Sequence, residues 1–141
     1  MKTKMIEQTV HFDAPARDVY EAYVRAKRHA AFTGAKASST PKPGGKMSAW
    51  DGYVRGRYLL LIPGKRIVQT WKSQTWPRGA DDSILDLRLK SKGKKTELTM
   101  VHSGIPAKPA SLAKGFTSGW PTSYWKPLAT YLKKARARSG R

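Results

Sequence analysis

Apolar and polar residues alternate along much of the chain with the two-residue period of half-buried β-strands. The first such run covers residues 5–12, where Ile6, Val10 and Phe12 are separated by polar or charged residues. Side chains two positions apart point to the same face of a strand, so these three residues form one apolar face. We therefore predict that residues 5–12 form a strand with one buried face.

The clearest alternation comes later, where leucines and charged residues alternate over residues 85–90. A lysine-rich turn follows, and residues 95–102 then place Leu98, Met100 and His102 on one face. Two alternating runs joined by a short polar turn are typical of a β-hairpin. These runs therefore predict two paired strands.

Turn-forming residues divide the middle of the chain into shorter segments. Pairs that contain glycine mark the turns, at residues 44–45, 51–52 and 63–64. The segments between them are predicted strands, at residues 36–40, 46–50, 53–62 and 65–74. Residues 76–82 contain proline, glycine and paired aspartates, and we predict a loop there.

Two short helices are predicted directly after the first strand. Asp13 is a candidate N-cap, and Pro15 suits a position at or near the start of a helix. Four residues share one apolar face of this helix: Val19, Tyr20, Tyr23 and Val24. A second helix over residues 26–32 is predicted to end at Gly34.

The last third of the chain predicts a longer helix that starts at Gly119 and Trp120. Its apolar stripe has helical spacing and consists of Tyr124, Trp125, Leu128, Ala129, Tyr131 and Leu132. Pro121 suits a first turn, whereas Pro127 removes a backbone donor inside the helix and predicts a kink there. The stripe is wide enough to lie across a sheet.

Composition limits the architecture to one domain. The chain has 141 residues and no cysteine, which excludes disulfides, thiolate metal sites and a thiol nucleophile. We predict a domain over residues 1–132 and a basic, disordered tail over residues 133–141. No signal-peptide core or membrane-spanning run is evident, so we expect a soluble cytoplasmic protein.

The chain is strongly basic, with 28 Lys and Arg against nine Asp and Glu and a formal charge of +19. Such a field attracts polyanions without sequence preference. The basic residues are spread along the chain, as on a solvated surface, and cluster only at residues 90–95 and 133–138. We interpret the first cluster as a hairpin tip and the second as a fraying helix end, with a phosphate-binding arm as the alternative.

Several short motifs occur in an order that resembles a known family. They are Phe32-Thr33-Gly34, Gly44-Gly45, Trp50-Asp51-Gly52, Ile67-Val68-Gln69-Thr70-Trp71, His102-Ser103-Gly104-Ile105-Pro106 and Gly119-Trp120. Together they resemble the activator of heat-shock protein 90 ATPase family, within the START-like helix-grip (SRPBCC) superfamily. The resemblance covers about residues 5–132. It implies an α+β helix-grip fold: a curved antiparallel sheet of six or seven strands, two short helices after the first strand, and a long C-terminal helix over a cavity.

The resemblance implies more than one function. In the family's two-domain chaperone activator, an N-terminal domain makes the main chaperone contact; we expect it to be missing here, because its motif is asparagine-rich and this chain contains no asparagine. Relatives across the superfamily bind lipids, polyketides or other apolar molecules. We therefore predict first a cavity for a small apolar ligand, either a lipid or an aromatic. A co-chaperone-like module acting on a heat-shock protein 90 homologue is the second prediction, and non-specific binding of polyanions, including nucleic acid, is the third.

The predicted cavity would be lined mainly by aromatic side chains, because these bury large areas at pockets and their rims. The predicted ligand-binding residues are Trp50, Tyr53, Trp71, Met100, His102, Trp120 and Tyr124. The alternative is that these side chains simply fill the core between helix and sheet.

Catalysis is not predicted. His102 and Ser103 are neighbours on a strand and point to opposite faces, which does not suit a nucleophile and its base. His102 alone as a general acid or base at the cavity mouth is the alternative to a histidine satisfied by backbone groups. The three histidines have no metal-site spacing, so we predict no enzyme activity, no metal and no cofactor.

Overall fold

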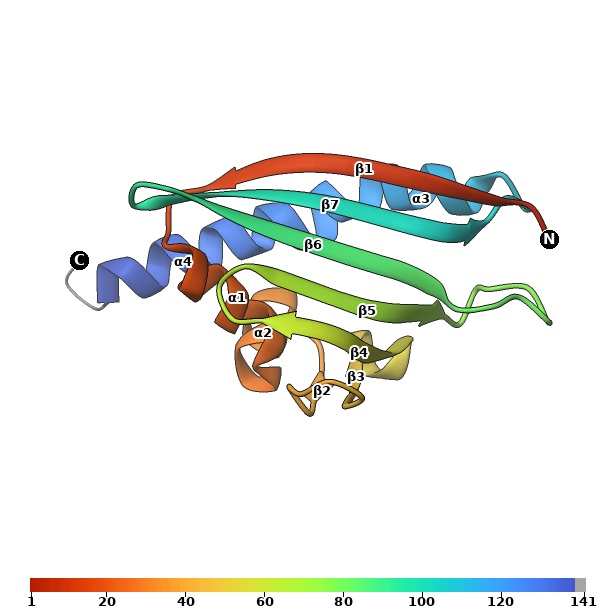
Figure 1. Cartoon of the computed structure of the whole chain (residues 1–141), viewed down its shortest axis with the longest axis horizontal. Helices are drawn as coiled ribbons and strands as arrows, with labels where there is room; N and C mark the ends of the chain where they lie inside the picture. The colour runs from red at the N-terminus through yellow and green to blue at the C-terminus, as the bar shows by residue number, and fades with distance from the viewer. Residues whose placement is uncertain (139–141) are drawn as a thin grey trace.

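The computed structural model describes residues 1–138 and contains a seven-stranded antiparallel sheet in the order β1-β7-β6-β5-β4-β3-β2 (Figure 1). The strands are β1 (Thr3–Phe12), β2 (Ser38–Ser39), β3 (Lys46–Ala49), β4 (Val54–Ile62), β5 (Arg66–Ser73), β6 (Ser83–Lys92) and β7 (Lys95–Pro106). The predicted α+β fold is confirmed. β7 extends beyond the predicted residue 102 because its last residues pair with the start of β1, and β2 is shorter than the predicted strand.

The helices lie on one face of this sheet, and Figure 1 shows the C-terminal helical run behind β7 and β6. They are α1 (Ala16–Val24), α2 (Ala26–Thr33), α3 (Ser111–Gly119), the π-helical segment η2 (Trp120–Trp125) and α4 (Lys126–Arg138). The two short helices predicted after the first strand are confirmed. α2 ends as predicted at Gly34, which adopts the left-handed conformation with φ of 80°.

Asp13 does not cap α1, contrary to the prediction. Pro15 occupies the N-cap position, and no side chain of the described residues caps this end of the helix. The Asp13 carboxylate instead accepts a hydrogen bond from Arg136 Nη1 at 2.9 Å, and the same Nη1 donates to the Asp13 carbonyl oxygen at 2.7 Å. The N-cap position therefore lies two residues after the predicted Asp13. Asp13 instead links the end of β1 to α4 through Arg136.

The C-terminal helical run begins at Ser111, earlier than the predicted start at Trp120. Its irregularity is the wide π-turn over residues 120–125, which lies just before Pro127 rather than at it. A proline ring clashes with the carbonyl four residues earlier, and a wider preceding turn moves that carbonyl away. Because the helical run begins at Ser111, Pro121 lies inside it and not in its first turn.

α4 continues through the basic residues 133–138, where the sequence predicts a disordered tail. Arg136 is held by Asp13, which supports the helix at this point. Residues 139–141 of that predicted tail lie outside the described residues. None of the helices within residues 1–138 is both long and apolar enough to cross a membrane.

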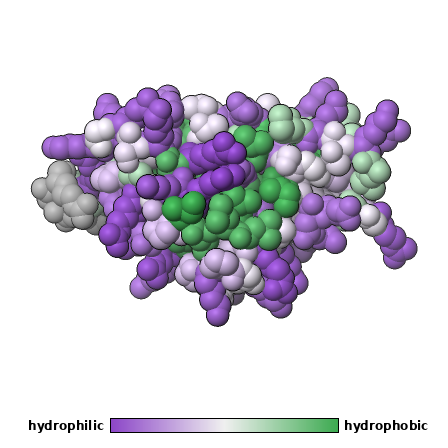
Figure 2. Space-filling view, viewed as in Figure 1, coloured by the Kyte–Doolittle hydropathy of each residue, from purple (hydrophilic) through white to green (hydrophobic). Residues whose placement is uncertain are grey.

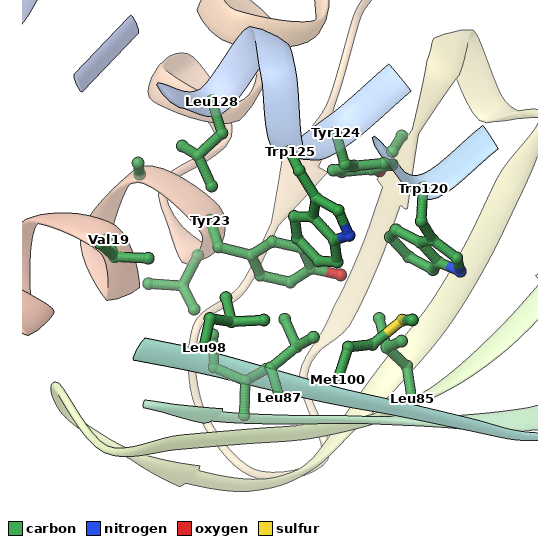
Figure 3. Close-up of a cluster of buried hydrophobic side chains, with 14 of the residues drawn as sticks. Val19, Tyr23, Leu85, Leu87, Leu98, Met100, Trp120, Tyr124, Trp125 and Leu128 are labelled. Carbon is green, nitrogen blue, oxygen red and sulfur yellow. The ribbon is translucent and has the colours of Figure 1, made fainter. Parts of the chain in front are cut away.

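The core lies between the helices and the inner face of the sheet (Figure 3). Leu85, Leu87, Leu98 and Met100 point up from β6 and β7, as the alternating pattern predicts. From the opposite side the helices contribute Val19, Tyr23, Trp120, Tyr124, Trp125 and Leu128. This packing fixes the position of the helix that forms one wall of the candidate site.

Candidate functional site

A pocket of about 490 Å³ lies between the C-terminal helical run and the end of the sheet that carries β4 and β5. Its lining comes from three segments of the chain: Trp50, Tyr53, Val54, Trp71, Thr75, Ser111, Leu112, Gly115, Phe116, Gly119, Trp120, Ser123 and Tyr124. Six of these residues are aromatic, and no residue of the lining carries a formal charge. The pocket is thus an apolar and aromatic site within a strongly basic protein.

One wall exists because the helix has small residues at every fourth position. Gly115, Gly119 and Ser123 fall on the same helical face and line the pocket. A Cβ atom added at Gly115 or Gly119 would meet no described atom within 4 Å outside the neighbouring helix backbone. The missing side chains therefore leave open space, and larger residues at these positions would fill it.

The remaining walls are aromatic rings in mutual contact. The Trp120 ring lies 4.8 Å from the Tyr124 ring and 5.1 Å from the Trp71 ring, measured between centroids. Phe116 contacts Trp71 edge-on at 6.2 Å, and Trp50 contacts Tyr124 edge-on at 5.9 Å. Such contacts hold each ring in place, so the pocket walls are formed before any ligand enters.

Trp50 reaches the pocket from a tight turn, the 3₁₀ segment η1 (Trp50–Gly52). Trp50 and Asp51 both have positive φ angles, of 55° and 58°, which are costly for residues other than glycine. Two hydrogen bonds hold the turn: the Lys36 N–H donates to Asp51 Oδ1 at 2.9 Å, and the Asp51 N–H donates to the Lys36 carbonyl at 3.0 Å. The strained turn places the Trp50 indole against the helix.

A buried hydrogen-bond chain fixes the wall formed by Trp50 and Tyr124. The Trp50 indole N–H donates to the Tyr124 hydroxyl oxygen at 3.2 Å, and the Tyr124 hydroxyl donates to His29 Nε2 at 3.0 Å. His29 Nδ1 donates to the Tyr23 carbonyl at 2.8 Å, so its other nitrogen must accept. Burial lowers the pKa of His29 and raises the pKa of Tyr124, which keeps both groups neutral.

A second buried chain fixes Trp120. Its indole N–H donates to His102 Nδ1 at 3.3 Å. Because an indole is only a donor, His102 must carry its hydrogen on Nε2, which donates to Ser83 Oγ at 2.8 Å. The Ser83 hydroxyl donates in turn to the Trp71 carbonyl at 2.8 Å. Burial lowers the pKa of His102 to about 3, so the imidazole is neutral.

Five of the seven predicted ligand-binding residues line the pocket: Trp50, Tyr53, Trp71, Trp120 and Tyr124. Met100 and His102 are not in the lining. Both are fully buried on β7, and Met100 packs beneath Trp120 beside Leu85 (Figure 3). They face the helix as predicted, but the Trp120 ring separates the strand from the pocket.

The sequence prediction missed the residues from α3, namely Ser111, Leu112, Gly115, Phe116 and Gly119. The four-residue spacing of Leu112, Phe116 and Trp120 was the available signal. Glycine and serine are poor helix formers and obscured it.

His102 has no free nitrogen for proton transfer, because both ring nitrogens are bonded to side chains. It is therefore satisfied by side chains rather than by the backbone groups expected, and it lies in the core rather than at a cavity mouth. In the described chain, no group of three or more His, Cys, Asp or Glu is placed to hold a metal. Among the side chains that line the pocket in the described part, Trp71 Nε1 is the only fully buried nitrogen or oxygen atom without a hydrogen-bond partner.

Comparison with known sequences gives a family match over most of the chain. The family described as Activator of Hsp90 ATPase homolog 1-like protein matches residues 13–133. Activator of 90 kDa heat shock protein ATPase homolog 1 of Homo sapiens is 33% identical over 79% of this chain and 32% of its own length. An uncharacterized protein of Schizosaccharomyces pombe is 30% identical over 92% of this chain and 38% of its own length. The chain thus spans only about a third of these relatives.

Solved structures show the same fold. An HSP90 activator from Plasmodium falciparum superposes with a TM-score of 0.84 at 24% identity, covering 92% of this chain and 96% of that one. CalU16 from Micromonospora echinospora gives a TM-score of 0.74 at 22% identity, covering 92% of this chain and 74% of that one. These similarities support the helix-grip arrangement of sheet and C-terminal helix.

Proposed function

This chain belongs to the Activator of Hsp90 ATPase homolog 1-like family, and we propose that it binds a small, uncharged, apolar molecule in the pocket between helix and sheet. The observation that carries the proposal is the row of small residues, Gly115, Gly119 and Ser123, facing aromatic walls. Core-filling side chains would close this space, whereas these residues keep it open.

The pocket has the size and composition of a small-molecule site. Its volume of about 490 Å³ lies within the roughly 300–1,000 Å³ typical of ligand pockets. Aromatic side chains offer flat faces for stacking with an apolar ligand. The lining within the described residues has no cation to pair with a carboxylate, which favours a neutral aromatic over a fatty acid.

Isothermal titration calorimetry of the whole chain with an uncharged flavonoid and with a fatty acid tests this proposal. Gly119→Leu should fill the pocket and abolish flavonoid binding while circular dichroism shows an intact fold. Ser118→Leu, an exposed neighbour outside the lining, is the matched control and should bind as the unmodified protein does. Failure of every apolar compound to bind, or equal binding by Gly119→Leu, would contradict the ligand pocket.

We propose no catalytic activity for this site. Three groups with acid–base character in or beside the lining, His29, His102 and Tyr124, are held neutral by burial and engaged in hydrogen bonds. A general acid or base must reach the reacting proton and change its charge near the working pH. The site is therefore proposed to bind without transforming its ligand.

A second proposed function is an interaction with a heat-shock protein 90 homologue. It is supported by the names of the relatives, which include activators of this chaperone's ATPase in Homo sapiens and Dictyostelium discoideum. The chaperone's ATPase rate, measured with increasing amounts of this chain, tests it together with direct binding by calorimetry. The absence of both binding and any change in the ATPase rate would contradict this second function.

Polyanion binding remains the third proposal and rests on charge alone. A net charge of +19 predicts weak association with nucleic acid that falls steeply with salt. A complex that is selective for sequence at physiological salt would contradict the non-specific character proposed here. A soluble cytoplasmic location stays a prediction from the sequence.

A further inference from the structure

The outer face of the sheet, turned away from the helices, is not covered by any helix of residues 1–138 (Figure 1). Such a face of an antiparallel sheet is expected to be polar. Figure 2 instead shows apolar residues gathered in the middle of this face, over β4 to β6, within a hydrophilic surround. This apolar patch has no role in the pocket, which lies on the opposite side of the sheet.

A bulge in β4 creates the most exposed part of the patch. The pairing with β5 shifts between Tyr58 and Leu60, so that Tyr58 is paired with Gln69 and Leu60 with Val68. Both Leu59 and Leu60 are consequently exposed, by 52% and 37%. A regular strand would have turned one of them inward, and bulges commonly redirect side chains in this way. Ile62, also exposed, extends the patch along β4.

A basic groove adjoins the patch. It has a volume of about 520 Å³, and its lining includes Lys46, Arg55, Arg57 and Lys72. Leu59 lines the same groove, so the groove and the patch form one continuous surface. One acidic residue, Asp82, also lies in the lining.

The cations of the groove lie opposite one another instead of opposite acids. Lys46 is paired across the strands with Arg57, and Arg55 is paired with Lys72. Like charges in directly opposed positions destabilise a sheet. None of these four residues forms an ion pair with a carboxylate of the described chain. Stability alone does not explain this arrangement, whereas a bound anionic group would offset its repulsion.

We propose that this surface docks an acidic protein segment that carries aliphatic side chains. Its carboxylates would pair with Lys46, Arg55, Arg57 and Lys72, and its apolar side chains would cover Leu59 and Leu60. Buried apolar contact supplies affinity at such an interface, while the charges supply orientation and rate of association. The proposal is independent of whether the pocket on the other face binds a ligand.

Two other occupants fit less well. Single-stranded nucleic acid needs aromatic faces on which bases stack, and the exposed apolar side chains here are the aliphatic Leu59, Leu60 and Ile62. A second copy of this chain would bring the same basic groove into contact and add repulsion between two molecules of charge +19. Charge complementarity therefore favours an acidic protein partner.

Nuclear magnetic resonance titration of the whole chain with a synthetic peptide of alternating glutamate and leucine tests the proposal. Saturable shifts are expected for β3, β4 and β5 amides on the outer face. Arg55→Glu combined with Lys72→Glu should weaken binding by about tenfold or more. Leu59→Ser combined with Leu60→Ser should also weaken it, without loss of fold, because both side chains are exposed.

Matched controls separate this surface from the overall charge. Lys92→Glu combined with Lys94→Glu makes the same charge change at the distant hairpin tip and should leave peptide affinity within about twofold. Equal weakening by this control, equal binding of polyglutamate, or tighter binding of a single-stranded oligonucleotide would overturn the proposal. Self-association of the chain through this face, measured by sedimentation, would also overturn it, as would the absence of peptide-induced shifts on this face. Pocket ligands should bind normally to every one of these variants, so failure of one proposal is distinguishable from failure of the other.

Discussion

The two faces of the sheet are formed by the same alternating strands but differ in burial and in the placement of polar and charged residues. The inner face is covered by helices, and its buried polar side chains His102 and Gln69 are hydrogen-bonded. The outer face leaves leucines exposed and places like charges opposite one another. The inner face therefore contributes most of the stability and encloses the pocket, whereas the outer face retains features that do not favour folding. Such features are expected where a surface binds a partner.

Truncating a large side chain on the inner face should have the largest effect. Trp120 is 2% exposed, and Trp120→Ala is expected to destabilise the protein by about 3–5 kcal/mol. Leu59→Ala on the outer face should cost about 0.5 kcal/mol or less. Urea unfolding followed by circular dichroism measures both. Similar losses for the two variants would remove the distinction between the faces.

Trp120→Ala also bears on the pocket. If Trp120 is a pocket wall, the variant should bind an uncharged aromatic compound more weakly than the unmodified protein. Reduced stability with unchanged affinity would show that Trp120 only fills the core. The affinity is to be compared at a temperature where the variant remains folded.

Acid should weaken the inner face through His102. Its pKa is lowered from 6.5 to about 3 in the folded protein, so between these values the unfolded chain binds the proton more tightly. The contribution is therefore complete above pH 6.5 and is lost as the pH falls. The free energy of unfolding should drop by about 1.4 kcal/mol per pH unit below pH 6.5 from this group. The buried His29 acts in the same direction.

Urea unfolding at a series of pH values measures this slope. His102→Gln should be less stable at neutral pH but should show a shallower decline on acidification. Leu98→Ala is the control, since it removes buried apolar contact on the same strand without removing a titratable group and should leave the slope unchanged. A stability that is constant between pH 7 and 5 would contradict the neutral, buried assignment of His102.

Adding a small side chain to the pocket wall should increase stability. Gly119 and Gly115 have helical conformations, and an added Cβ meets open space at both. Gly119→Ala and Gly115→Ala should each stabilise the protein by about 0.5–1 kcal/mol, because alanine loses less entropy in a helix. Thermal unfolding measures the change. A destabilising result would indicate that the space beside the glycines is occupied.

The smallest effect is expected from the outer-face charges. Lys46→Glu would place an acid opposite Arg57 and should stabilise the protein by about 0.2–1 kcal/mol. Lys46→Gln removes the repulsion without adding attraction and should give a smaller gain. Unfolding at low and high salt measures both, and the gain should shrink as salt screens the pair. No gain at low salt would mean that the cations do not repel one another.

Most of the fold followed from alternation and turn residues. The strands and the first two helices were predictable because their apolar positions keep a regular period, and Gly34 marked the end of α2. The start of the last helix was not, because α3 contains glycine and serine where strong helix formers would have signalled a helix. Asp13 was misassigned because a proline two residues later took the N-cap position.

The candidate site was predictable only in part. Aromatic content pointed to five pocket residues, but alternation cannot show which inward side chains lie beneath a helix. Met100 and His102 share a face with pocket residues and are nevertheless covered by Trp120. The outer-face patch could not be predicted for another reason. The bulge at Leu59 reverses which face the following side chains point to, and a regular period of two contains no such reversal.

The most direct test of the pocket is a titration with an uncharged flavonoid, followed through the indole N–H signals of the five tryptophans. We predict saturable shifts for Trp50, Trp71 and Trp120, which line the pocket, and smaller ones for Trp76 and Trp125, which do not. Gly119→Leu should abolish these shifts, and Ser118→Leu should keep them. No shift of the three lining indoles, or identical shifts in Gly119→Leu, would contradict a ligand pocket between helix and sheet.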